Sequence, residues 1–286
     1  METFVLPDGR NLTYDVYGDP AGTPVIFNHG LSDSRLIRNP DESLTASLGV
    51  RVIAADQPGV GGSTPLKDRR MIDWGPDMKA LADSLGLDVF NVAGHSGGSP
   101  HALSIARCMP ERVNKIVLAS PVTPLNEKGM SRLLINKDLK LLTKLHGLSK
   151  LIEIGSNLAA KKAMKDMPAF MESTAADDPS DASTFLNDPA QRAMFEASFR
   201  EGMAQGGVGM YEMTMALWEW GFEPEDITRP VKVFYGDADD LIDPQMPQHL
   251  ASRLPNSELQ AWPGAGHYGF VDRARWIEMF SAVNAL

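Results

Sequence analysis

The feature that most constrains this fold is a series of four short apolar runs in which hydrophobic residues follow one another with little polar interruption. Two segments with helical periodicity, residues 73–87 and 99–110, separate the last three runs. A strand buried on both faces has this continuous apolar pattern, whereas a strand with one solvated face alternates. The pattern therefore predicts an α/β fold, with a mostly parallel sheet covered by helices on both faces. The runs are residues 24–30, 49–63, 88–96 and 112–120.

Both ends of the chain extend this architecture. Near the start, apolar segments flank a Pro-Asp-Gly turn at residues 7–9, which predicts a β-hairpin. Apolar runs return at residues 230–240 and 257–270, and residues 273–286 have the pattern of a closing helix.

The strand pattern stops in the middle of the chain. Residues 121–228 contain helical stretches and a polar loop, together with nine of the chain's 15 methionines. We interpret this segment as a helical cap, or lid, inserted into the α/β core. The predicted domains are a core of residues 1–120 and 229–286 and a cap of residues 121–228.

Composition excludes several classes of protein. A net charge of −10 and a pI near 5.1 argue against a nucleic-acid-binding surface. The single cysteine, Cys108, leaves no internal disulfide and is expected to be a buried, unreactive thiol. The first residues show no secretory leader, and no apolar run reaches the length of a membrane span. We expect a soluble, cytoplasmic protein without a nucleic-acid or membrane partner; its oligomeric state stays open.

The motif Gly-His-Ser-Gly-Gly, residues 94–98, lies between an apolar run and a helical one. A serine on a tight strand-to-helix turn has a strained backbone, and flanking glycines keep the crossing chain segments from colliding. Such a turn exposes the Ser96 hydroxyl at the carboxyl edge of the sheet and directs the Gly97 N–H towards the same space. Ser96 is therefore the predicted nucleophile.

A serine nucleophile needs a base, and His267 is the leading candidate among six histidines. It lies in a glycine-rich loop after an apolar run and shortly before the last helix, where it can reach over the sheet edge. The other five are expected to be structural or misdirected: His29, His95, His101, His146 and His249.

An acid must orient the base and stabilise its charged form. Residues 237–243 follow an apolar run and contain four aspartates, Asp237, Asp239, Asp240 and Asp243, of which the pattern alone selects none. The order serine, aspartate, histidine along the chain fits this architecture. The backbone N–H groups of Gly97 and Leu31 are the expected oxyanion hole, because each follows a predicted strand.

Taken together, these motifs resemble the α/β-hydrolase superfamily over nearly the whole chain. The resemblance rests on residues 28–30, 56–63, 94–98, 236–243 and 264–267. It implies an eight-stranded, mostly parallel sheet with a cap after the sixth strand, and neither a metal nor an organic cofactor. The family spacing Gly-x-x-Asp selects Asp239 as the acid, with Asp237 and Asp240 as alternatives. Asp56 resembles a position that orders its loop.

The expected activity is hydrolysis of a carboxylic ester through an acyl-enzyme on Ser96, with His267 as base and Asp239 as acid. Lactonase, C–C bond hydrolase, imino-peptidase and perhydrolase activities use the same triad. A ligand-binding protein of the same fold that does not turn over substrate is a further alternative.

The substrate pocket is less determined. Met213, Trp218 and Trp220 lie in an apolar stretch of the cap that predicts either a hydrophobic ester pocket or a contact between cap and core. Arg35 and Arg38 follow the predicted oxyanion turn, where they meet either a substrate carboxylate or acids of the chain itself.

Overall fold

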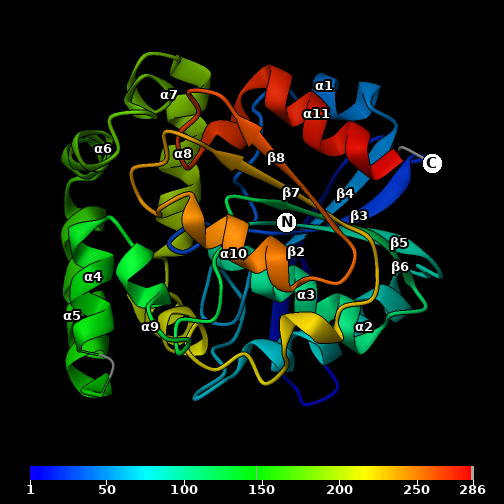
Figure 1. Cartoon of the computed structure of the whole chain (residues 1–286), viewed down its shortest axis with the longest axis horizontal. Helices are drawn as coiled ribbons and strands as arrows, with labels where there is room; N and C mark the ends of the chain where they lie inside the picture. The colour runs from blue at the N-terminus through cyan, green and yellow to red at the C-terminus, as the bar shows by residue number, and fades with distance from the viewer. Residues whose placement is uncertain (146, 285–286) are drawn as a thin grey trace.

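A computed structural model describes residues 1–145 and 147–284 of the chain (Figure 1). Its centre is an eight-stranded sheet. The strands are β1 Glu2–Val5, β2 Asn11–Gly18, β3 Thr23–Asn28, β4 Val50–Ala55, β5 Phe90–His95, β6 Val113–Ala119, β7 Val231–Gly236 and β8 Ser257–Trp262. Their order across the sheet is β1-β2-β4-β3-β5-β6-β7-β8.

The predicted parallel sheet and the predicted hairpin are both confirmed. β1 and β2 pair antiparallel around the turn, where Gly9 has a φ of +87°, and β2 pairs antiparallel with β4. All remaining neighbours are parallel. Since parallel strands end at the same edge, the loops that follow β3, β5, β7 and β8 meet there.

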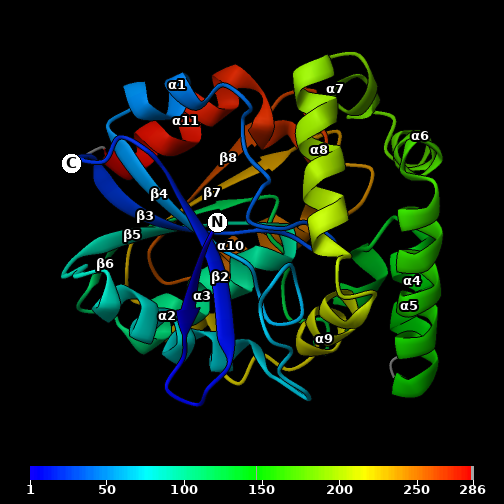
Figure 2. The same cartoon turned by 180° about the vertical axis from the view of Figure 1, so that it is seen from behind.

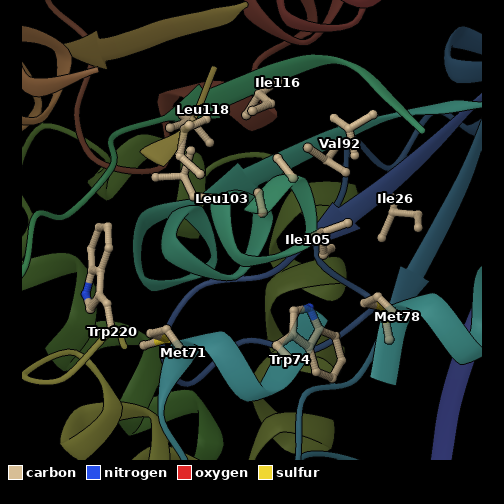
Figure 3. Close-up of a cluster of buried hydrophobic side chains, with 14 of the residues drawn as sticks. Ile26, Met71, Trp74, Met78, Val92, Leu103, Ile105, Ile116, Leu118 and Trp220 are labelled. Carbon is tan, nitrogen blue, oxygen red and sulfur yellow. The ribbon is translucent and has the colours of Figure 1, made fainter. Parts of the chain in front are cut away.

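Helices cover both faces of the sheet, as the apolar runs predict. The helices of the core are α1 Glu42–Ser47, α2 Trp74–Ser84, α3 Ser99–Cys108, α10 Gln245–Arg253 and α11 Arg273–Asn284. One hydrophobic cluster joins α2, α3 and α10 to one face, and a second joins α1 and α11 to the other. Figure 3 shows part of the first cluster, with Trp74 and Met78 of α2 beneath the strand residues Ile26 and Val92. The adjacent Phe27 belongs to the second cluster, because successive strand residues face opposite sides.

Six helices are inserted between β6 and β7. They are α4 Lys137–Lys144, α5 Ser149–Lys165, α6 Met167–Asp177, α7 Ala182–Leu186, α8 Pro189–Gly202 and α9 Val208–Ala216. Both views place them together at one side of the sheet, with α4 and α5 at the outer edge (Figures 1 and 2). We call α4–α9 the helical insertion.

Single 3-10 turns complete the structure: Met71–Asp73, Ser96–Gly98, Met130–Leu133, Pro224–Asp226 and Gly269–Val271. Within the described residues, no helix combines the length and apolarity needed to cross a membrane.

Candidate active site

Ser96 lies at the turn between β5 and α3, where the sequence predicts a nucleophile. Its φ is +51°, a left-handed value that is uncommon for a residue with a side chain. The flanking glycines have no room for a side chain. A Cβ on Gly94 would lie 2.6 Å from the carbonyl oxygen of Gly98, and one on Gly98 would overlap the carbonyl oxygen of Asn28. The two glycines therefore allow the close packing that holds the Ser96 turn in its strained form.

His267 and Asp239 form a buried pair, although 28 residues separate them. The His267 Nδ1 atom lies 2.7 Å from an Asp239 carboxylate oxygen, which can only accept. The other Asp239 oxygen accepts hydrogen bonds from the backbone N–H groups of Leu241 at 2.8 Å and Ile242 at 2.9 Å. The carboxylate is thus held in place by its own loop and directed at the imidazole.

The neighbouring aspartates have other partners. Asp237 accepts a hydrogen bond from the Gly264 N–H, and Asp240 accepts one from the Ser180 N–H. Asp243 accepts one from the Gln245 N–H. Of the four acids in this loop, the structure pairs Asp239 with the imidazole of His267.

Ser96 and His267 line one narrow cavity, and so do the two predicted oxyanion residues, Leu31 and Gly97. A Cβ built on Gly97 would lie 3.7 Å from the Leu31 nitrogen, so these two backbone segments face each other. The rest of the wall is apolar apart from one hydroxyl: Val122, Leu125, Leu134, Leu139, Thr214, Leu217, Trp218 and Ile242.

The cavity is small. About 40 Å³ is open to the centre of a water-sized sphere, which corresponds to room for about three waters. Among the residues that the structure describes, no carboxylate, lysine or arginine lines it. A substrate larger than a few atoms therefore requires side chains of the wall to move.

The three predicted substrate-binding residues occupy different parts of the structure. Trp218 lies on the cavity wall. Met213 is buried beside Gly97, since a Cβ built on Gly97 would lie 2.8 Å from the Met213 sulfur. Trp220 is in the hydrophobic core instead (Figure 3). Its ring lies 5.5 Å from that of Phe222. The prediction that Trp220 lines the pocket is not supported, because the chain turns back to the core after Trp218.

The two arginines near the oxyanion turn bind acids of the chain itself. Arg35 is buried and pairs with Asp56 at 2.5 Å, with Glu201 of α8, and with Asp15 at 3.3 Å. Arg38 stacks over the Tyr17 ring and lies 3.4 Å from Glu42. Neither arginine is among the cavity-lining residues of the described chain. The Asp56 carboxylate accepts hydrogen bonds of 2.8 Å from the Arg35 N–H and from the Thr13 hydroxyl, so it joins its loop to the segment after β3 and to β2.

Four of the other histidines are described, and His146 lies outside the described residues. The His95 side chain lies closer to the loop of His267 than its sequence position beside Ser96 suggests. Its Nε2 atom lies 3.0 Å from the backbone carbonyl of His267, and the two rings are 4.8 Å apart. It therefore ties the serine turn to the loop of the base. The remaining three contact other groups: His29 the Gln57 N–H, His101 the Gly97 carbonyl and His249 the Glu127 carboxylate.

A buried carboxyl that the sequence analysis missed is Asp33. It lies below the serine turn, 3.8 Å from His95 Nδ1, and burial raises its pKa to about 7. The number of residues between Asp33 and Ser96 does not reveal that Asp33 lies near His95, because the fold of the loop after β3 brings it there.

Two further acids come from the helical insertion and were also missed. Asp178 and Asp181, in the loop between α6 and α7, are both buried. Asp181 accepts a hydrogen bond of 2.5 Å from the Tyr268 N–H, directly after the base. Gly266 has no room for a Cβ, which would lie 2.5 Å from the Asp181 carboxyl carbon. The insertion is thus packed against the loop that carries His267.

These acids affect the proton affinity of His267, the predicted base. Burial, the largest single effect, lowers the pKa of His267, but the carboxylate of Asp239 together with those of Asp178 and Asp181 outweighs it. The result is a pKa raised above the ordinary value of 6.5. Burial and the Asp178 carboxyl raise the pKa of Asp181 itself to about 7.

A pH profile tests this electrostatic arrangement. A base must be neutral to accept a proton, so we expect the acid limb of kcat/KM to lie above pH 6.5. Because its pKa is raised to about 7, Asp181 is negatively charged mainly above that pH. Asp181→Asn removes this charge but keeps an acceptor oxygen for the Tyr268 N–H, and it should move the part of the limb above pH 7 to lower pH. The control is Asp177→Asn, a partly exposed acid that pairs with Lys137. An unchanged limb in Asp181→Asn would refute the coupling between Asp181 and His267.

The eight-stranded sheet, the serine turn and the buried His–Asp pair define the class of an α/β-hydrolase. The sequence model of the family described as "alpha/beta hydrolase fold" matches residues 23–274, so the chain belongs to this family.

Known relatives carry several activities. The chain is 37% identical over 131 residues to a non-heme chloroperoxidase of Streptomyces lividans. The aligned segment covers 45% of this chain and 48% of that protein. It is 28% identical over 269 residues to a bifunctional esterase/perhydrolase of Acinetobacter calcoaceticus, covering 91% and 90%. The chain thus spans about half the length of the first relative and nearly all of the second.

Solved structures support the fold. The enol-lactonase of Burkholderia xenovorans LB400 superposes with a TM-score of 0.73 over 99% of each chain, at 16% identity. At this identity the likeness concerns the fold alone.

Proposed function

We propose that this α/β-hydrolase cleaves carboxylic esters with an apolar acyl group, through an acyl-enzyme on Ser96. The observation that carries the proposal is the wall of one apolar cavity. It brings together Ser96, the Asp239-bound His267 and the backbone of Leu31 and Gly97. The triad and its order along the chain are those of a serine hydrolase.

The hydrogen bond between His267 and Asp239 determines how the base acts. Because the carboxylate only accepts, the proton between them belongs to His267 Nδ1, and Nε2 keeps its lone pair. His267 then takes the Ser96 proton through Nε2 as the serine oxygen attacks the ester carbonyl. The N–H groups of Leu31 and Gly97 stabilise the negative charge that forms on the carbonyl oxygen.

The second half of the reaction reverses these roles. The imidazolium of His267 protonates the departing alcohol, which leaves an acyl group on Ser96. A water molecule, deprotonated by His267, attacks this acyl group. His267 then returns the proton to the Ser96 oxygen as the bond to the acyl carbon breaks and the acid is released. Asp239 stabilises the positive charge on His267 in both halves.

The cavity wall points to the substrate class. A wall of leucine, valine, isoleucine and tryptophan side chains favours an apolar group and offers no ion pair to a charged one. An imino-peptidase must bind the amine of its substrate, and the described lining of this cavity contains no carboxylate. The apolar wall therefore favours an ester over a peptide with a free amino terminus.

Lactone hydrolysis is the second candidate. It uses the same triad and the same oxyanion hole, and the structural neighbour that acts as an enol-lactonase shares the fold. A ligand-binding protein that does not turn over substrate remains the alternative of a different class.

A substrate panel distinguishes these candidates. We expect turnover of p-nitrophenyl butyrate, slower turnover of unsubstituted lactones, and none of proline p-nitroanilide. We also expect covalent labelling of Ser96 by a fluorophosphonate, located by peptide mass spectrometry. Preference for a lactone or a coloured dienoate over every ester would reassign the substrate. A serine that does not react with the probe would favour the ligand-binding alternative.

A further inference from the structure

The outer edge of the helical insertion has an unusual surface. Of the eleven large hydrophobic side chains exposed in the described part of the chain, seven lie between residues 135 and 164. They are Ile135, Leu141, Leu148, Leu151, Ile154, Leu158 and Met164. Monomeric soluble proteins rarely expose apolar side chains in such a group without a partner.

The side chains of α5 show that this surface is organised. Its inner face is buried and consists of Ile152, Ser156, Ala160 and Ala163. Leu151, Ile154 and Leu158 are spaced by three and four residues, which places them on one outward face of the helix, each with more than half of its surface exposed. Lys161 and Lys165 continue the same spacing in the following turns. We call the exposed apolar and basic side chains of α4 and α5 the outer face.

Charge identifies the kind of partner. Residues 137–165 contain seven lysines against only Asp138 and Glu153, a formal charge of +5 within a chain of net charge −10. All seven lysines are exposed, and Lys137 pairs with Asp177 at the end of α6. A helix with exposed leucines and flanking lysines is typical of segments that lie on anionic lipid surfaces.

A second copy of the chain fits this face less well. In a two-fold dimer the same patch contacts itself, so the positive charge of one copy would face that of the other. An anionic surface instead attracts the lysines and covers the leucines together. With 17 residues, α5 is about 25 Å long and lies along the edge of the molecule (Figures 1 and 2).

We infer that the outer face docks the protein on the surface of an anionic phospholipid bilayer, without spanning it. This departs from the expectation of no membrane partner, which considered membrane spans alone. The docking does not depend on the reaction at Ser96. The two sites are nevertheless adjacent, because Leu139 of α4 lies on the cavity wall while Leu141 of the same helix is exposed.

Vesicle flotation of the full chain tests the docking. We expect the protein to float with vesicles of phosphatidylcholine and phosphatidylglycerol mixed equally and to remain behind with phosphatidylcholine alone. High salt should release it, because the screening length falls to about 3 Å at 1 M. Lys161→Gln with Lys162→Gln should lower the partition coefficient about 25-fold, at about five-fold for each lysine.

Apolar variants complete the test. Leu151→Ser with Leu158→Ser should lower partitioning about ten-fold, because two leucines no longer enter the interface. The matched control is Val89→Ser with Leu259→Ser, which removes two side chains exposed to a similar degree (59% and 42%) on other parts of the surface. Circular dichroism reports folding, and turnover of a soluble ester should be unchanged in all variants.

Two results would overturn the inference. One is the absence of flotation with the anionic vesicles, or an equal loss in the control variant. The other is a dimer in light scattering that Leu158→Ser dissociates while vesicles do not bind, which would assign the outer face to a second copy. Failure of ester turnover in the wild type bears on the proposed function alone, since flotation needs no chemistry.

Discussion

Ser96→Ala is expected to abolish hydrolysis of p-nitrophenyl butyrate, with kcat falling by about 10⁶-fold, as for removal of a nucleophile in a serine protease. The variant loses the oxygen that attacks the carbonyl but retains the rest of the cavity. Fluorophosphonate labelling should disappear at the same time. Initial rates and intact-protein mass measure the two effects.

The same variant should leave the fold intact. Alanine keeps the Cβ atom, so the backbone at φ +51° has the same steric surroundings as in the wild type. The thermal midpoint should therefore stay close to that of the wild type. Turnover that survives in Ser96→Ala would show that the reaction uses another nucleophile, and the proposed mechanism would be wrong.

Asp239→Asn should lower kcat by about 10⁴-fold at neutral pH. The backbone N–H groups of Leu241 and Ile242 will hold the amide oxygen where they now hold a carboxylate oxygen. The amide NH₂ then faces His267 Nδ1, which must become an acceptor. Its proton moves to Nε2, so His267 can no longer take the proton of Ser96.

The matched control is Asp237→Asn, a residue two positions away in the same loop. Its carboxylate accepts a hydrogen bond from the Gly264 N–H, and an amide oxygen can replace it. We expect activity within a few-fold of the wild type. A loss in Asp237→Asn as large as that in Asp239→Asn would mean that the loop as a whole matters, and the role of Asp239 would be refuted.

Much of the fold is predictable from the sequence because it depends on local patterns. Continuous apolar runs predicted the parallel strands, since such strands are buried on both faces. The short helix α1 escaped prediction, because its six residues are too few for a periodic pattern. The order of the strands across the sheet could not be predicted from the sequence either. Nothing local places β4 between β2 and β3, because that arrangement depends on crossovers of the whole chain.

The candidate site divides in the same way. Ser96 can be predicted from the sequence, because its tight turn requires glycines nearby and the sequence shows them. The local pattern does not single out the acid, because four aspartates share one loop. The family resemblance selected Asp239, and the approach of a loop from another strand shows that this residue faces His267. Asp33 and Asp181 carry no local signal, since each reaches the site across the fold and has its pKa raised by burial there.

Local residue patterns were enough to predict the strands, their helical cover and the strained serine, because each follows from the periodicity or sterics of neighbouring residues. The pairing of Asp239 with His267, the place of Trp220 in the core and the outward leucines of α5 emerged from the folded chain alone. Those outcomes depend on which distant surfaces meet, and burial between them is a property of the folded chain rather than of any segment.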